Sequence, residues 1–473
     1  MIDINLIREQ PDWVKAQIDK LNDPGALARI DNILELDKRR RAMLTESETI
    51  QAARNKLNKS IGRLRGDKKL DNATRGALAA RASALLLARD YDGAAALLGG
   101  AGVIEPDPTI DVDAALADLM RGVGEMGTQV EAILEHLKGV EADLEENMLW
   151  LPNLPHASVP VAESEEANIG WTPEGEFYEY DFELKPHWEI GPALDIIDFE
   201  RGIKLSGSRA YVLKGMGARL QRALISLFLD MARDKGFTEL YVPYLVREDM
   251  MIGAGQFPKF REQVYFDPEA DLYMIPTAEV AITNLHRDEI LDEAQLPLYY
   301  VAHTPCFRRE RASAGRDVRG IKRVHQFEKV EMYKFTSPET SYDELESLVE
   351  AASDVCRALK LPFRRLEIVT GDLGFSATKK YDIEVWSPGV QEWLEVSSCS
   401  NTEAFQARRA NVKYRAEGQK RAQFVHTLNG SGLATPRVII AILENFQQAD
   451  GSVAVPDVLR PYMGGVEVIR KVE

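Results

Sequence analysis

The 473-residue chain is poor in cysteine, with only Cys306, Cys356 and Cys399, and none of them forms a CxxC pair. This scarcity argues against a disulfide framework and against a cysteine-rich zinc site, so we expect reduced thiols. No run approaches the ~20 apolar residues that a membrane-spanning helix needs. A secretory signal begins with a basic stretch followed by an apolar one, and residues 1–6 show neither. We therefore expect a cytoplasmic location.

Basic residues are also in deficit, with 58 Lys and Arg against 75 Asp and Glu and a formal net charge of −17. Taken alone, this sum argues against a protein that binds polyanions nonspecifically, although it can conceal a local basic surface. Hydrophobic residues make up 45% of the chain and charged residues 28%, which excludes wholesale disorder. The length is sufficient for two to four domains.

Two stretches of equal length, 32–70 and 112–150, carry apolar residues at heptad spacing. In the second stretch the steps alternate between four and three residues: Leu119, Val123, Met126, Val130, Ile133, Leu137, Val140 and Leu144. This pattern is typical of a coiled coil, and the equal lengths predict an antiparallel hairpin. Arg40, Ser47 and Arg54 occupy weak positions of the first seam.

The two helices of this predicted hairpin differ in charge. Residues 36–69 contain eleven Lys or Arg and four Asp or Glu, whereas residues 113–146 contain nine acidic and two basic residues. Complementary pairing of the two helices with solvated outer faces would explain this difference. A basic rod that lies along a nucleic-acid backbone would explain it equally well, and composition does not decide between the two interpretations.

Prolines at 152 and 155 end the second helix, so we predict a helical arm over 1–155 and a second domain over 156–473. Residues 71–111, which are rich in Ala and Leu and then loop-like, form an extra helical insertion in the arm. The second domain alternates short β-like runs with helical segments and lacks both dinucleotide-binding and P-loop glycine motifs. These features predict an α+β fold whose mainly antiparallel sheet is flanked by helices.

Three stretches of the second domain carry its distinctive motifs. A helix over 218–235 runs into an extended segment that reaches Pro243. Cys306-Phe-Arg-Arg-Glu310 and Arg323-Val-His-Gln-Phe-Glu-Lys-Val-Glu331 flank a charged loop, and Leu428-Asn-Gly-Ser-Gly-Leu-Ala-Thr-Pro-Arg437 opens a helix. In this order they resemble the three signature motifs of class II aminoacyl-tRNA synthetases. With Thr277-Ala-Glu279, Glu395–Asn401 and the arm, the chain resembles the bacterial form of the seryl-tRNA synthetase family.

The resemblance implies an enzyme that activates L-serine with ATP and Mg²⁺ to seryl-adenylate and pyrophosphate, then transfers serine to the 3′ end of tRNA(Ser). Charging of a selenocysteine tRNA stays open. The resemblance also implies a homodimer through the motif-one region, 236–243, with the arm of one subunit gripping the variable arm of a tRNA. No membrane partner is implied.

The resemblance assigns roles to individual residues. Arginine suits phosphoryl chemistry because its planar fork binds phosphate oxygens bidentately. The catalytic residues are Arg308, Arg437 and Glu395. The ATP site comprises Arg308, Arg309, Glu310, Val324, Phe327, Glu395, Val396, Ser397, Ser398 and Arg437. Mg²⁺ ligands are Glu395 and Ser398. The serine site comprises Thr277, Ala278, Glu279, Arg308, Glu331, Asn429 and Ser431. The tRNA contacts are Arg40, Arg54, Lys56, Lys59, Arg63, Arg316 and Arg319.

Two other functions would explain parts of the sequence. A ligase of the same fold could load an amino acid onto a carrier protein, but such relatives generally lack the arm. A non-catalytic tRNA-binding paralogue is expected to have lost residues of the ATP site, whereas Arg308, Glu310, Glu395 and Arg437 are all present.

Overall fold

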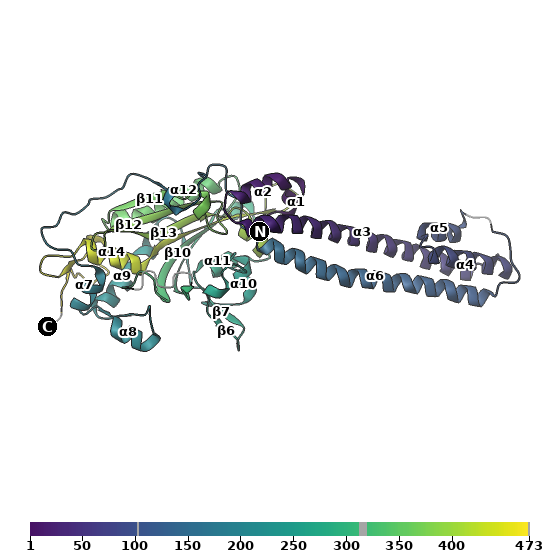
Figure 1. The fold of residues 1–473 in the computed structure, drawn as a ribbon, viewed down its shortest axis with the longest axis horizontal. Coiled ribbons are helices and arrows are strands. Elements are labelled where there is room, and N and C mark those ends of the chain that lie inside the picture. The colour runs from purple at the N-terminus through teal and green to yellow at the C-terminus, as the bar shows by residue number, and fades with distance from the viewer. Residues whose placement is uncertain (102–103, 312–318, 472–473) are drawn as a thin grey trace. The chain divides into compact units, whose positions relative to one another are not determined.

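The computed structural model describes residues 1–101, 104–311 and 319–471. The chain divides into two compact units (Figure 1): Arg29–Met148 forms one, and Met1–Ala28 together with Leu149–Glu473 forms the other. The sequence-based boundary at residue 155 differs from this division, because residues 1–28 and 149–155 belong to the larger unit. None of the described helices is both long enough and apolar enough to cross a membrane.

The smaller unit is a helical hairpin made by α3 (Pro24–Gly66) and α6 (Val112–Leu149), as Figure 1 shows. The helices are antiparallel, since Arg29 near the start of α3 donates a hydrogen bond of 3.2 Å to Asn147 near the end of α6. The heptad residues form the buried seam, with Leu57 and Leu119 fully inaccessible to solvent. The predicted antiparallel hairpin is confirmed.

The insertion between the two long helices packs on the hairpin. It contains α4 (Asn72–Leu87), α5 (Tyr91–Ala96) and a π-helical turn (Leu97–Ala101). Small side chains of α4 and α5, among them Ala79, Ala82 and Ala94, are buried in one hydrophobic cluster with α3 and α6. Leu86 approaches Gly122 of α6 closely, because a Cβ atom on that glycine would lie 3.2 Å from Leu86 Cδ1. The insertion therefore thickens the hairpin with a third helical layer.

The larger unit is built on an eight-stranded sheet, and the predicted α+β class is confirmed. Neighbouring strands are antiparallel except for the pair of β4 and β9 at one edge. In spatial order the strands are β1 (Ile169–Gly170), β11 (Phe363–Glu367), β12 (Lys379–Ser387), β13 (Glu392–Asn401), β16 (His426–Ala434), β10 (Gln326–Thr336), β9 (Leu298–Phe307) and β4 (Thr238–Leu240).

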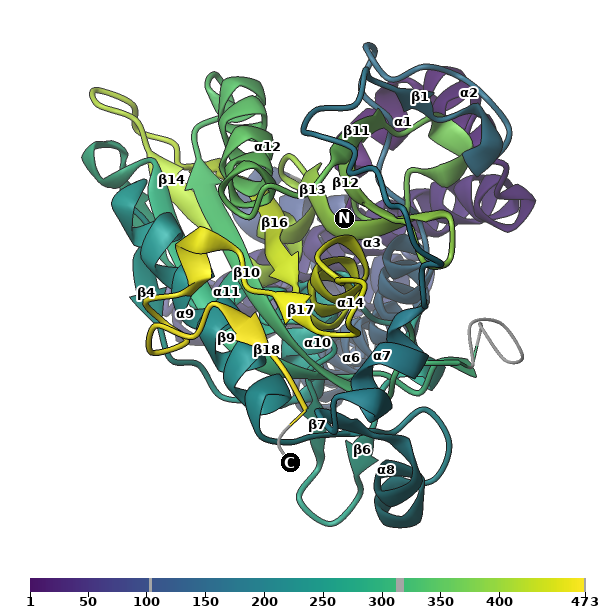
Figure 2. The same ribbon diagram turned by 90° about the vertical axis from the view of Figure 1, so that its left-hand side faces the viewer.

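Three helices, α9 (Met216–Asp234), α12 (Ser341–Ala358) and α14 (Thr435–Asn445), share one hydrophobic core with this sheet (Figure 2). Successive side chains of a strand point to opposite faces. Val330 and Met332 of β10 accordingly point into the core, while Lys329 and Glu331 point to the other face. The polar face of the sheet is thereby left for the functional site.

Shorter elements surround the sheet. The remaining helices are α1 (Ile4–Glu9), α2 (Pro11–Asp19), α7 (His187–Ala193), α8 (Phe199–Ser206), α10 (Glu248–Gly253), α11 (Glu279–Thr283) and α13 (Phe405–Ala410). The small sheets pair β2 (Ile197–Asp198) with β3 (Val212–Leu213), β7 (Leu272–Met274) with β5 (Leu245–Val246) and β6 (Phe266–Asp267), β14 (Lys413–Arg415) with β8 (Ile290–Asp292) and β15 (Gln423–Phe424), and β17 (Val453–Ala454) with β18 (Val468–Ile469).

Candidate active site

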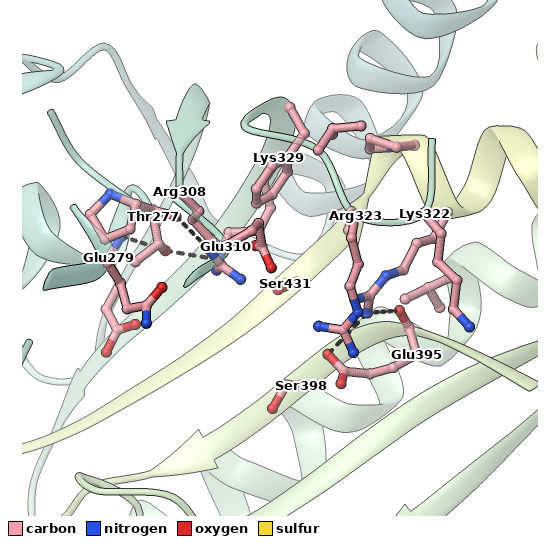
Figure 3. A pocket seen from close by; sticks show the side chains of 18 of the residues that line it. Thr277, Glu279, Arg308, Glu310, Lys322, Arg323, Lys329, Glu395, Ser398 and Ser431 are labelled. Carbon is pink, nitrogen blue, oxygen red and sulfur yellow. Dashed lines mark hydrogen bonds and ion pairs between the residues drawn. The ribbon is translucent and has the colours of Figure 1, made fainter. Parts of the chain in front are cut away.

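A cavity of about 550 Å³ lies over the polar face of the sheet. Figure 3 shows Thr277 and Glu279 at one end and Arg323, Lys322 and Glu395 at the other. Most of the residues predicted for the ATP and serine sites line this one cavity: Thr277, Glu279, Arg308, Glu310, Val324, Phe327, Glu395, Val396, Ser398, Asn429, Ser431 and Arg437. Five separate stretches of sequence thus converge on a single space.

Two β-bulges aim these side chains. In β13, Ser397 pairs with Ile383 and Glu395 pairs with Glu384, so Val396 is an extra residue. A bulge shifts the alternation of side chains by one, which is why Glu395 and Ser398, three residues apart, both line the cavity. A similar irregularity in the pairing of β16 with β10 follows Ser431.

Two arginines, Arg308 in the middle of the cavity and Arg437 at its basic end, supply positive charge. Arg308 follows β9, its Nε donates to the carbonyl of Pro276 at 3.3 Å, and its guanidinium lies 5.1 Å from the ring centre of Phe327. Arg437 lies in the first turn of α14, where the helix dipole adds positive potential. Arg437 also donates to the backbone oxygen of Glu395 at 2.5 Å and lies 3.5 Å from its carboxylate.

The carboxylate of Glu395 is kept ionised by its neighbours. Burial alone would raise the pKa of Glu395, but the charges of Arg437, Lys380 and Arg308 outweigh it and lower the pKa. Asp382, on the adjacent strand, behaves in the opposite way: burial raises its pKa to about 7 although Lys380 lies 3.2 Å away. At Glu395 the cavity therefore presents a carboxylate whose ionised form is favoured by the neighbouring basic side chains.

The opposite end is acidic and buried. Glu279 opens α11, and its Oε1 accepts a hydrogen bond of 2.6 Å from Gln406. Asn429 lies 3.4 Å from the carboxylates of both Glu279 and Glu331. Burial, followed by the charge of Glu331, raises the pKa of Glu279 to about 7. A small cation that enters here gains a carboxylate partner, and its arrival favours the ionised form.

This raised pKa makes a testable prediction about pH. If Glu279 holds an α-ammonium group, as the resemblance implies, we expect the KM of an amino-acid substrate to rise about tenfold between pH 8 and pH 6, since each pH unit below the pKa removes about tenfold of the ionised carboxylate. Glu279→Gln removes the titrating group and should give a higher but flat KM. A wild-type KM that is constant over this range would contradict the assignment.

Four of the predicted site residues do not line the cavity. Arg309 turns away, with its guanidinium 5.3 Å from the ring centre of Tyr265. Ala278 is fully buried in a hydrophobic cluster, and Ser397 donates a hydrogen bond of 2.6 Å to the backbone oxygen of Ser431 beneath the cavity floor. Glu331 is also fully buried; it forms an ion pair with Lys329 directly behind Thr277.

Sequence reasoning missed several residues of the site. Lys329 lines the cavity, is 7% exposed and donates to Thr277 Oγ1 at 2.8 Å. It stands two residues before Glu331, so the strand period alone could have placed it on the same face. Gln406 is fully buried beneath Glu279 and carried no sequence signal. Lys322 and Arg323 line the basic end.

The predicted tRNA contacts on the arm fall into two groups. Arg40 lies 3.6 Å from Asp37 and 3.9 Å from Glu141 of α6, and Arg54 packs over Gly127 of the same helix. These two arginines therefore support the hairpin seam. Exposed side chains at spacings of three and four residues form the basic stripe, which consists of Lys56, Lys59 and Arg63. In the larger unit Arg319 lies 5.7 Å from the ring centre of Trp188, and Arg316 is outside the described residues.

Two family models match the chain. Residues 1–85 match the model described as "Seryl-tRNA synthetase N-terminal domain". Residues 260–446 match "tRNA synthetase class II core domain (G, H, P, S and T)". The second match covers most of the strands and motifs that line the cavity.

Relatives that match over the full length of the chain are serine–tRNA ligases. The chain is 55% identical to the serine–tRNA ligase of Roseiflexus sp. (strain RS-1) and 53% identical to that of Roseiflexus castenholzii, with 100% of both chains covered in each comparison. Among solved structures, it is similar to the seryl-tRNA synthetase of Pyrococcus horikoshii complexed with ATP. That likeness has a TM-score of 0.83 and 35% identity, and it covers 100% of both chains.

Proposed function

The chain belongs to the seryl-tRNA synthetase family, enzymes that ligate serine to tRNA with ATP, and from this premise we propose how its own residues carry out the reaction. The observation that carries the proposal is the polarity of the single cavity. Its acidic end, at Glu279, suits an ammonium group, and its basic end, at Arg323 and Arg437, suits phosphates. An amino acid and ATP bound in this orientation bring the carboxylate and the α-phosphate together between the two ends.

Activation requires attack by the serine carboxylate on the α-phosphorus, with pyrophosphate as the leaving group. Arg308 lies between the acidic end and the basic end, and we assign it to both the carboxylate and the α-phosphate. Its fork neutralises charge that accumulates as the bond to pyrophosphate breaks. Arg437, at the start of α14, is assigned to the γ-phosphate. No protein base is needed, since the carboxylate attacks in its ionised form.

Recognition of serine is assigned to the acidic end. Glu279 holds the α-ammonium group, with Thr277 and Asn429 beside it. Glu331 and Ser431 are assigned to the side-chain hydroxyl. Glu331 lies beneath the cavity lining beside Thr277 and Asn429, and the serine hydroxyl would add a hydrogen bond to it that alanine cannot supply. The ion pair between Lys329 and Glu331 fixes the position of this carboxylate.

Adenine is assigned to Glu310, Val324 and Phe327. Glu310 lines the cavity and is suited to accept hydrogen bonds from the adenine amino group. The ring of Phe327 offers a stacking face, and the backbone of Val324 borders the same space. The sequence motifs assign the same three residues to the ATP site.

Mg²⁺ fits the basic end of the cavity. Within residues 1–101, 104–311 and 319–471 no group of three or more His, Cys, Asp or Glu is arranged to hold a metal. Mg²⁺ needs no such group, because it is usually bound by one or two carboxylates together with substrate phosphates and water. Glu395, whose pKa is lowered, and Ser398 supply hard oxygen donors. The ion would neutralise phosphate charge during the reaction.

A substitution at Glu395 tests this assignment. We expect Glu395→Ala to raise the Mg²⁺ concentration for half-maximal ATP–pyrophosphate exchange by about tenfold or more, since one of two protein oxygens is lost. Glu417→Ala is the control, as Glu417 is exposed and does not line the cavity. An unchanged Mg²⁺ dependence in the Glu395 variant would contradict the assignment.

The partner molecules are proposals of the same kind. The basic stripe of Lys56, Lys59 and Arg63 is assigned to the phosphate backbone of tRNA(Ser), which it would read by charge and shape. A homodimer through 236–243 is supported by the exposure of Tyr241, which is 88% accessible beside the edge strand β4. A cytoplasmic location stays a prediction.

A further inference from the structure

A buried carboxylate on α14 is hydrogen-bonded away from the cavity. Glu444 lies seven residues after Arg437 on the same helix and is fully inaccessible to solvent. Its Oε1 accepts from the backbone nitrogen of His187 at 2.9 Å and lies 3.0 Å from Nδ1 of the same residue. Its Oε2 accepts from the Gly389 nitrogen at 3.0 Å and from the Ser387 hydroxyl. Both oxygens are therefore satisfied within the protein.

The imidazole of His187 has a second partner on its far side. Its Nε2 lies 3.2 Å from the backbone nitrogen of Ile321. A backbone N–H only donates, so Nε2 accepts and Nδ1 carries the proton that is donated to Glu444. The two hydrogen bonds fix one neutral tautomer of a side chain that is 2% exposed. His187 thus joins α14 to the chain at Ile321.

Ile321 begins the segment 321–324, all four residues of which line the cavity at its basic end. The preceding residue, Gly320, has φ = +71°, and a Cβ atom there would lie 1.9 Å from His187 Nε2. Only glycine fits this close approach without displacing the imidazole or the backbone. The chain therefore turns into the cavity directly against His187.

We propose that Glu444 and His187 are positioning residues for ATP. They form a buried relay that holds the segment 321–324 at a fixed place relative to α14, whose first turn carries Arg437. Neither residue lines the cavity, so they would act on ATP only through the backbone that they hold. The inference rests on the proposed function in one respect, the assignment of ATP to this end of the cavity. The serine end, at Glu279, shares none of the relay's hydrogen bonds.

Two substitutions of one residue separate positioning from packing. In His187→Asn the amide nitrogen takes the place of Nδ1 and keeps the bond to Glu444, but the side chain is too short to reach Ile321. In His187→Gln the amide oxygen reaches the place of Nε2 and accepts from Ile321. We expect the Asn variant to raise the KM for ATP about tenfold in ATP–pyrophosphate exchange, the value of one lost hydrogen bond, with the KM for serine unchanged. The Gln variant keeps the contact with Ile321 but loses the side-chain bond to Glu444, and it should restore part of the affinity.

A third variant reaches the same contact from the loop. Gly320→Ala changes neither Glu444 nor His187 but places a Cβ atom against His187 Nε2, and it should also raise the KM for ATP alone, so it carries the test if the His187 variants fail to fold. Glu189→Ala, at an exposed position of α7, is the control that should change neither KM. Equal effects of Asn and Gln at position 187, or equal rises in both KM values, would overturn the proposal.

A direct binding measurement separates this proposal from the one on which it rests. Calorimetric titration of the full chain with Mg–ATP should give a weaker Kd for His187→Asn and Gly320→Ala than for the wild type and Glu189→Ala. If the wild type binds ATP but shows no serine-dependent exchange, the assigned reaction fails while the relay is still supported. Unchanged Kd values in both variants would refute the relay whatever the reaction.

Discussion

Arg308→Ala is expected to lower serine-dependent ATP–pyrophosphate exchange by about 10³-fold or more, mostly in kcat. Arginine side chains that stabilise charge on a transferring phosphoryl group contribute effects of about this size. Arg308 lines the cavity between the acidic and basic ends, and its orientation is held by the carbonyl of Pro276 and the ring of Phe327. Stopped-flow or steady-state exchange assays at saturating serine and ATP would measure the loss.

The adjacent residue provides a matched control. Arg309→Ala removes the same charge one residue later, but its guanidinium lies over Tyr265 and does not line the cavity. We expect a change of less than about tenfold in exchange, since no contact with a reacting group is lost. Equal losses at the two positions would show that general charge, rather than the placement of Arg308, accounts for the effect.

Removal of the arm is expected to separate the two half-reactions. If a short glycine–serine linker replaces residues 32–148, exchange should stay within about twofold of the wild type, while charging of tRNA(Ser) falls by about 10²-fold or more because the tRNA is no longer positioned. The ends of the deleted segment are close together, as the hydrogen bond between Arg29 and Asn147 indicates. Both assays use the same preparation, and equal charging by the two proteins would contradict a role for the arm.

Charge reversal on the intact arm sharpens this test. The triple variant Lys56→Glu, Lys59→Glu and Arg63→Glu should charge tRNA(Ser) much more weakly at physiological salt. Its charging should also depend less on salt, because fewer phosphate contacts release counterions. Arg40→Gln and Arg54→Gln should act chiefly through the stability of the hairpin, since both side chains face α6. Thermal unfolding followed by circular dichroism would distinguish the two classes.

The arm could be predicted from its sequence because heptad spacing reports burial directly. Leu57 and Leu119 stand at predicted seam positions and are fully buried. The same pattern also identified Arg40 and Arg54 as weak seam positions, yet the family resemblance implied that they contact tRNA. In the structure Arg40 and Arg54 point toward α6, as their seam positions require. The side chains of the basic stripe are exposed instead.

The catalytic motifs predicted many of the residues that line the cavity but not how their side chains are oriented. Glu395 and Ser398 share a face only because Val396 is bulged, and no local pattern in the sequence predicts a bulge there. Ser397, which alternation would have placed with Glu395, lies beneath the floor. Tertiary pairing between strands that are distant in sequence sets these positions.

The supporting residues were hardest to predict. Gln406 and His187 carry no charge pattern or motif, and each acts through a contact with residues more than 100 positions away in the chain. Lys329 lay within a recognised motif, yet its burial beside Glu331 follows from the packing of three strands rather than from the motif itself. Such long-range contacts become visible only in three dimensions.

The most direct test of the account is amino-acid-dependent ATP–pyrophosphate exchange by the wild-type chain, with serine, threonine, alanine and glycine compared at equal concentration. We predict exchange with serine that exceeds exchange with each of the others by about 10²-fold or more in kcat/KM, because alanine and glycine lack the hydroxyl assigned to Glu331 and Ser431, and threonine adds a methyl group beside it. Exchange that favours threonine, alanine or glycine, or no exchange with any of the four, would contradict the account.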